Sequence, residues 1–166
     1  MLRTRLNSSY IKRTFRPTYG WTQMTPKSVF LDPAWDRATP IWPGMVMTKG
    51  VGDTVTLVGA TANVPYGFAG LYVGGDGIDE PLDAGINTFA VWVLAADAEA
   101  EVLAPAFDTA LTYTDTAGAE LLLHAQTTGA NRGKLVPAGT ANATTAPVAR
   151  LLKVNSPTKI TIGGLR

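Results

Sequence analysis

Short apolar runs separated by turn-forming residues make up most of the chain from residue 38 onward. The most apolar of them is the eight-residue run FAVWVLAA at 89–96, which lies between Gly85 and Asp97. Its short length and its β-branched and aromatic side chains predict a buried strand.

Two further runs, at 45–48 and 54–58, flank the loop KGVGD at 49–53, and this arrangement predicts a β-hairpin. Other runs predict strands at 68–73, 120–125, 147–154 and 158–162, while 98–103 fits either a strand or a helical turn. Turn signals about every eight to twelve residues are typical of sandwiches and barrels. The predicted fold class is all-β: a single β-sandwich or small β-barrel domain with an extended N-terminal arm.

The first 37 residues differ from the rest of the chain in composition. They hold seven Lys or Arg against two Asp, a net charge of +5, whereas residues 38–166 hold seven against eleven acidic residues, a net charge of −4. Pro17, Pro26 and Pro33 favour an extended chain without a core of its own. The sequence therefore divides into a basic, aromatic docking arm at 1–37 and a β-rich body at 38–166.

Three interpretations of the arm are open: a flexible tail, a nucleic-acid-binding segment, or a segment that docks on a partner subunit. Its aromatic side chains would be costly to leave in water. The acidic body would repel a polyanion, so docking on a protein is favoured and direct nucleic-acid binding is not expected. The residues expected to contact the partner are Arg3, Arg5, Lys12, Arg13, Phe15, Arg16, Tyr19 and Trp21.

Residues 51–131 carry eleven acidic residues and no Lys or Arg. Four of the carboxylates, those of Asp76, Asp79, Glu80 and Asp83, lie in one Gly-rich loop. Their spacing is only weakly similar to a calcium loop and lacks the EF-hand pattern. A solvated outer loop is the favoured interpretation, and no metal site is expected.

The sequence contains no recognisable catalytic set. His124, the only histidine, lies in an apolar run, and there is no cysteine, so the usual transition-metal sites are not expected. Asp97, Glu99 and Glu101 alternate along the chain, which places them on the solvent face of a strand and makes a glycosidase pair the weaker interpretation. No nucleophile elbow or phosphate loop is present. We expect a protein that is not an enzyme and needs no cofactor.

Residues 44–71 and 118–151 share a weak pattern of Gly, Ala, Asn and Pro positions. The two segments are either a duplicated unit or a chance match in a chain rich in Gly and Ala.

Several short phrases resemble the head decoration, or cement, proteins of tailed bacteriophages. They are PGMV at 43–46 with the Gly-Asp hairpin that follows, PYGFAGL at 65–71, the run 89–108 ending in EVLAPAFD, PVARLL at 147–152 and ITI at 160–162. The resemblance implies a small β-rich structural protein of the virion that binds the outer surface of the capsid. It also implies contact with the major capsid protein, clamping of neighbouring capsid subunits, and a homo-oligomer, with a trimer favoured.

Other functions stay open at this stage. A tail-tube or head–tail connector subunit would form a six-fold ring, and a carbohydrate- or cell-binding β module would need an exposed aromatic groove on the body. An enzyme would depend on Asp97 or Glu99. No apolar run reaches the roughly 18–20 residues of a membrane helix, so no membrane partner is expected.

Overall fold

The computed structural model describes residues 14–20, 24–35, 39–74, 88–114 and 120–165. Within these ranges the chain forms eleven strands and one short 3-10 turn. Their bounds are β1 Phe15–Tyr19, β2 Met24–Leu31, β3 Val46–Lys49, β4 Thr54–Leu57, β5 Pro65–Ala69, β6 Thr88–Leu94, β7 Glu99–Leu103, β8 Leu122–Ala125, η2 Gly129–Asn131, β9 Leu135–Pro137, β10 Ala149–Ser156 and β11 Lys159–Gly163. The all-β prediction is confirmed.

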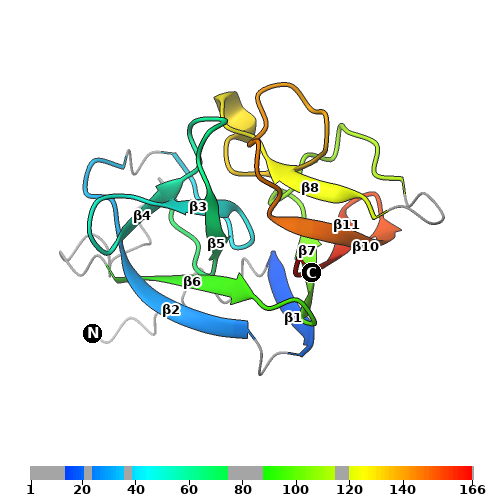
Figure 1. Cartoon of the computed structure of the whole chain (residues 1–166), viewed down its shortest axis with the longest axis horizontal. Coiled ribbons are helices and arrows are strands. Elements are labelled where there is room, and N and C mark those ends of the chain that lie inside the picture. Colours follow the sequence, from blue (N-terminus) through cyan, green and yellow to red (C-terminus); the bar gives the residue numbers. More distant parts are fainter. Residues whose placement is uncertain (1–13, 21–23, 36–38, 75–87, 115–119, 166) are drawn as a thin grey trace, which may run out of the picture.

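The strands form two packed bodies of sheet (Figure 1). One is a closed barrel with the strand order β2-β4-β3-β5-β6. The other is a six-stranded sheet with the order β1-β7-β11-β10-β8-β9. Almost all neighbours are antiparallel, and the pairing of β2 with β4, which closes the barrel, is parallel.

The predicted hairpin at 45–58 and the predicted core strand at 89–96 are both present. In the hairpin, β3 pairs with β4, with Met47 opposite Leu57, and both side chains are buried. The core strand, β6, pairs antiparallel with β2 on one side and with β5 on the other, so it is a central strand of the barrel wall. Of its described side chains, Val91 is fully buried and those of residues 90 and 92–94 are half-buried. The apolar run therefore becomes the strand that joins β2 to β5.

Two predictions differ from the structure in detail. The strand expected at 68–73 begins earlier, at Pro65, and ends at Ala69. A proline can be the first residue of a strand because its missing N–H then costs little pairing. The segment 98–103 is a strand, β7, and not a helical turn. Its alternating burial places Glu99 and Glu101 on the outer face, as expected.

The two halves of the molecule repeat one strand order. The first five-strand unit reads β4-β3-β5-β6-β2 and the second reads β9-β8-β10-β11-β7. In the first unit a parallel pairing joins Leu31 to Val55, and in the second a parallel bridge joins Phe107 to Leu135. A shared order with the same parallel closure favours a duplicated unit over a chance match.

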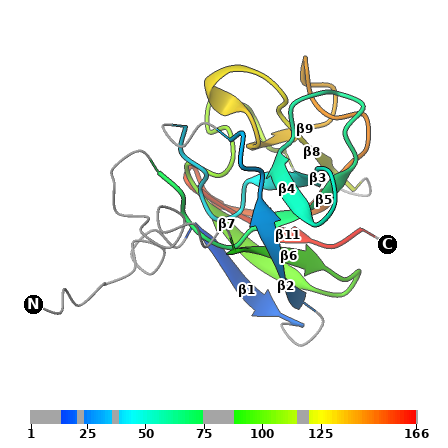
Figure 2. The same ribbon diagram turned by 90° about the vertical axis from the view of Figure 1, so that its left-hand side faces the viewer.

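Part of the predicted arm belongs to these sheets. β1 pairs with β7, and β2 pairs with β4 and β6, although both strands lie within residues 1–37 (Figure 2). Phe15 is 7% exposed and its ring stacks on that of Phe68 at 5.3 Å between centroids. β1 and β2 are therefore extended, but Phe15 and Leu31 belong to the core of the body.

Candidate interaction surface

Strand β1 brings three of the predicted contact residues into the described part of the fold. Arg16 and Tyr19 are exposed, and Tyr19 exposes 66% of its surface, whereas Phe15 points into the core. Residues Arg3, Arg5, Lys12, Arg13 and Trp21 lie outside the described residues, as does the acidic loop with Asp76, Asp79, Glu80 and Asp83. Of the three, Phe15 is therefore a core residue, and Arg16 and Tyr19 are surface residues.

β1 is the edge strand of the six-stranded sheet. The N–H of Leu103 donates to the carbonyl of Thr14 at 2.8 Å, and Arg16 lies opposite Glu101. Backbone groups of an antiparallel strand alternate in direction, so those of Phe15 and Pro17 point away from β7. Because Pro17 has no N–H, this open edge offers few donors to a further strand. Its side chains, more than its backbone, are therefore available for recognition.

A second cluster of cationic and aromatic side chains was not predicted from the sequence. The ammonium nitrogens of Lys49 and Lys27 lie 4.8 Å and 5.6 Å from the centre of the Tyr66 ring. The two lysines come from β3 and β2, and the tyrosine from β5. These positions are far apart in the sequence and carry no shared motif, so only the closed barrel brings them together.

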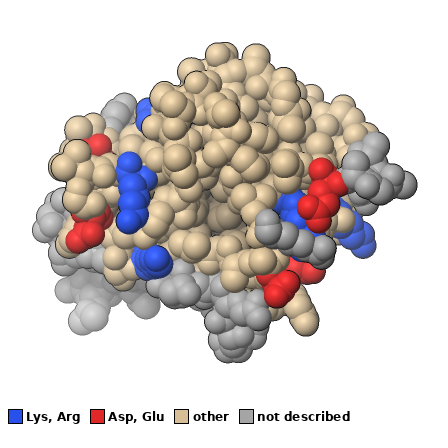
Figure 3. Space-filling model, in the orientation of Figure 1, with Lys and Arg blue, Asp and Glu red and all other residues tan. Residues whose placement is uncertain are grey.

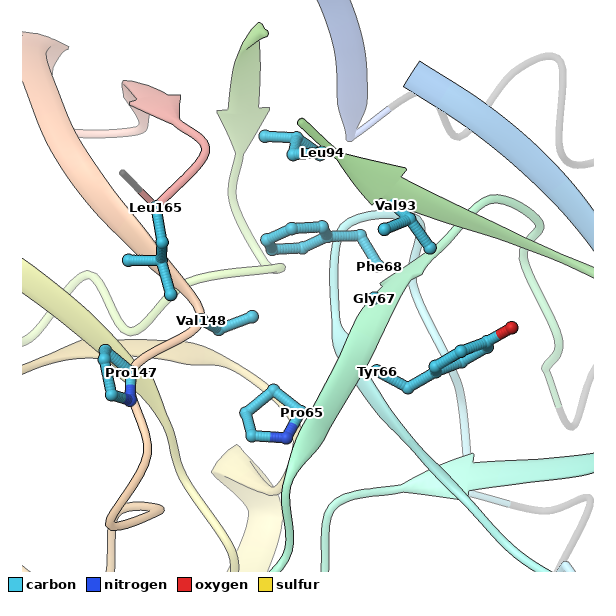
Figure 4. A pocket seen from close by; sticks show the side chains of 9 residues that line it. All are labelled: Pro65, Tyr66, Gly67, Phe68, Val93, Leu94, Pro147, Val148 and Leu165. Atoms are coloured by element: carbon cyan, nitrogen blue, oxygen red, sulfur yellow. The ribbon is translucent and has the colours of Figure 1, made fainter. Parts of the chain in front are cut away.

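The described residues form a groove between the barrel and the sheet and another beside Tyr113. One, of about 190 Å³, lies between the barrel and the sheet and is lined by Pro65, Phe68, Val93, Leu94, Pro147, Val148 and Leu165, with Tyr66 and Gly67 (Figure 4). In Figure 4 the Tyr66 ring points away from Phe68 and Leu165. The other groove, of about 180 Å³, lies beside Phe107 and Tyr113.

Tyr113 is the one described residue with a clearly shifted ionisation. Its hydroxyl donates to the carbonyl of Leu135 at 2.8 Å. Burial raises the pKa of Tyr113 well above its ordinary value, and the negative charge of Asp108 raises it further. The phenol therefore stays neutral and acts as a structural donor.

The other candidate catalytic groups are engaged in structural contacts or exposed. Nδ1 of His124 lies 2.6 Å from the carbonyl oxygen of Thr144. Glu101 pairs with Lys159 at 3.2 Å, and Asp97 is exposed. Within the described ranges no group of three or more His, Cys, Asp or Glu residues is arranged to hold a metal ion. The described part of the chain offers surfaces for binding, and it brings together no nucleophile with a base and an orienting group.

Charge is spread in separate groups over the surface. Figure 3 shows Lys and Arg atoms on one side of a central hollow, and a second group on the other side, next to acidic atoms. Arg150 pairs with Glu120 at 2.8 Å. Among the helical segments of the described chain, none is long and apolar enough to cross a membrane.

A β-rich body with exposed cationic and aromatic side chains is suited to binding the surface of a partner. The family model of the phage cement protein matches residues 1–166, and the chain belongs to this family. Membership gives the chain a structural, capsid-stabilising role in a bacteriophage virion, with the capsid as its binding partner. No curated protein and no solved structure matches the chain.

Proposed function

We propose that this cement protein binds the outer surface of the capsid and clamps neighbouring major capsid subunits. The observation that carries the proposal is the family match over the whole chain. The surface supports it, because the described residues present exposed cationic and aromatic side chains without assembling a catalytic group.

The N-terminal residues form one part of the proposed contact. Arg16 and Tyr19 are exposed on the edge strand β1, directly after the basic residues 1–13. Arg3, Arg5, Lys12 and Arg13 would meet carboxylates of the shell, and Tyr19 and Trp21 would bury against it as aromatic anchors. Phe15 supports this surface from the core.

We further propose that the chain acts as a homotrimer. Each copy then contributes its own contacts, and linked copies bind a repeating surface far more tightly than one copy alone. Many weak contacts of one kind suit a protein that reinforces a symmetric shell.

The test is binding to expanded capsids that lack the protein. A chain that begins at Thr14 keeps β1 and β2 and removes only residues 1–13, so we expect it to fold and to lose most of its binding. A chain that begins at residue 38 is unsuitable, because it would lose both strands and open the barrel. Bound protein is measured by sedimentation with the capsids, with circular dichroism as the folding control. Equal binding by the full chain and the chain from Thr14 would refute docking through residues 1–13.

A further inference from the structure

The hairpin end of the barrel gathers two positive charges on one aromatic ring. Lys49 and Lys27 approach the Tyr66 ring at 4.8 Å and 5.6 Å, and both lysines are exposed. Each cation gains a modest attraction to the ring face, but two like charges beside one ring also repel each other. An anionic group placed between them would be stabilised by both.

A β-bulge directs Tyr66 to this position. Along the pairing of β3 with β5, Met47 lies opposite Gly67 and Thr48 lies opposite Pro65, so Tyr66 has no partner across the ladder. A bulge re-aims the side chain of its extra residue, and bulges are frequent at barrel rims and beside functional sites. The orientation of Tyr66 is therefore built into the backbone of the barrel.

Exposed apolar side chains lie close in sequence to two of these residues, Lys49 and Tyr66. Val51 is 91% exposed two residues after Lys49, and Val64 is 71% exposed two residues before Tyr66. A hydrogen bond from Thr48 Oγ1 to the carbonyl of Val64 holds the two segments together. They add apolar contact area to the cationic end of the barrel.

No carboxylate of the described residues neutralises the positive charges of this surface. Neither lysine forms an ion pair with any carboxylate in the described residues. Asp53 is the acidic side chain nearest in sequence, in the turn between β3 and β4, and it too forms no ion pair with them. The surface therefore combines uncompensated positive charge with apolar contact area, which complements a carboxylate beside an apolar side chain.

We infer that this end of the barrel is a second docking surface, which takes a carboxylate-bearing, partly apolar segment of a capsid subunit. We call it the lysine–tyrosine surface: Lys27, Lys49 and Tyr66 with Val51 and Val64. The inference rests on the proposed function, since it names a second contact with the same partner. Figure 1 places the β3–β4 hairpin and β1 on different sides of the molecule, so one chain with both surfaces could contact two capsid subunits at once.

The first experiment compares charge reversals in capsid binding. The double variant Lys27→Glu/Lys49→Glu should bind expanded capsids at least about tenfold more weakly than the natural chain, and its binding should depend less on salt. Lys153→Glu is the matched control for Lys49→Glu, because Lys153 is also an exposed strand lysine, on β10. It should bind as the natural chain does. The neutral variant Lys27→Gln/Lys49→Gln provides a second measurement if charge reversal disturbs folding.

The second experiment identifies the partner group. A carbodiimide joins amines to carboxylates that already form ion pairs, and mass spectrometry of the complex then identifies the peptides joined through Lys27 or Lys49. Joining to an acidic residue of the capsid subunit supports the inference. Joining only to a second copy of this chain, or to nothing, overturns it.

The two proposals fail in different ways. If the natural chain does not bind expanded capsids, the proposed function is refuted and the second docking surface with it. If the natural chain binds and the lysine double variants bind equally well, only the lysine–tyrosine surface is refuted.

Discussion

At the scale of single residues, Arg132 joins the two halves of the molecule. Its Nε and one terminal nitrogen donate to the carbonyls of Val58 and Leu57, each at 2.8 Å, and its guanidinium lies 5.0 Å from the centre of the Trp35 ring. Arg132 follows η2 in the second unit, and both carbonyls lie at the end of β4 in the first. The side chain therefore satisfies carbonyls that the barrel leaves unpaired at that point.

We expect Arg132→Lys to lower the free energy of unfolding by about 2 kcal/mol, because lysine keeps the charge but cannot make both hydrogen bonds. Urea unfolding followed by circular dichroism measures the change as a shift of the midpoint with an unchanged slope. Lys134→Arg, two residues away, is the control and should leave the midpoint in place. An unchanged midpoint for Arg132→Lys would show that the two bonds contribute nothing net.

Tyr113 predicts how stability changes at high pH. Burial, and then the charge of Asp108, raise its pKa in the folded chain, while in the unfolded chain it ionises near its ordinary value of about 10. Above that pH the unfolded state loses a proton that the folded state retains, so the free energy of unfolding falls as pH rises. Tyr113→Phe should reduce this fall, and it should cost about 1 kcal/mol at neutral pH through the lost bond to Leu135. Urea midpoints measured between pH 8 and 11 test both parts. If the midpoint falls with pH equally steeply in the natural chain and in Tyr113→Phe, the pH dependence does not come from Tyr113.

At the scale of elements, β1 presents a core face and a surface face within five residues. Phe15→Ala removes a ring that is 7% exposed and stacked on Phe68, and it should cost about 3–5 kcal/mol of stability. Tyr19→Ala removes a ring that is 66% exposed and should leave stability nearly unchanged while weakening capsid binding. Thermal unfolding and capsid sedimentation of both variants separate the two roles. If Phe15→Ala weakens capsid binding and Tyr19→Ala does not, Tyr19 is not a contact residue.

The predictability of each element follows from how local its signal is. The hairpin 45–58, the strand at 89–96 and the outward carboxylates of β7 were predicted because period-two alternation and turn residues are read from neighbouring positions. The start of β5 at Pro65 was missed because tertiary pairing decided it. Likewise, the membership of Phe15 in the core could not be read from a segment rich in proline and charge, because its partner Phe68 lies far along the chain.

How well the candidate contact residues could be predicted also depends on how local their sequence signal is. Arg16 and Tyr19 are exposed, and their contact with a partner stays a prediction. Lys27, Lys49 and Tyr66 were not predicted, because their contact depends on barrel closure and on a one-residue bulge. The weak repeat between 44–71 and 118–151 became informative only when the two units were found to share a strand order.

At the scale of the whole molecule, the proposed trimer makes a prediction about mass. Native mass spectrometry of the full chain should show a particle of three 17.5 kDa chains. A hexamer would instead favour a tail-tube subunit, and a monomer at micromolar concentration would remove avidity between linked copies from the proposal. Measuring the same protein with and without residues 1–13 shows whether those residues hold the copies together.

The position of β1 has a mechanical consequence. If residues 1–13 dock on the capsid as proposed, tension on them reaches the described chain at Thr14 and runs along β1 toward Tyr19. Ladder hydrogen bonds of an antiparallel pair stand perpendicular to the strands. A pull along the strand axis therefore loads the bonds between β1 and β7 together, in shear, instead of breaking them one at a time. Under the proposed docking, this attachment would resist internal pressure better than an attachment at the end of a loop.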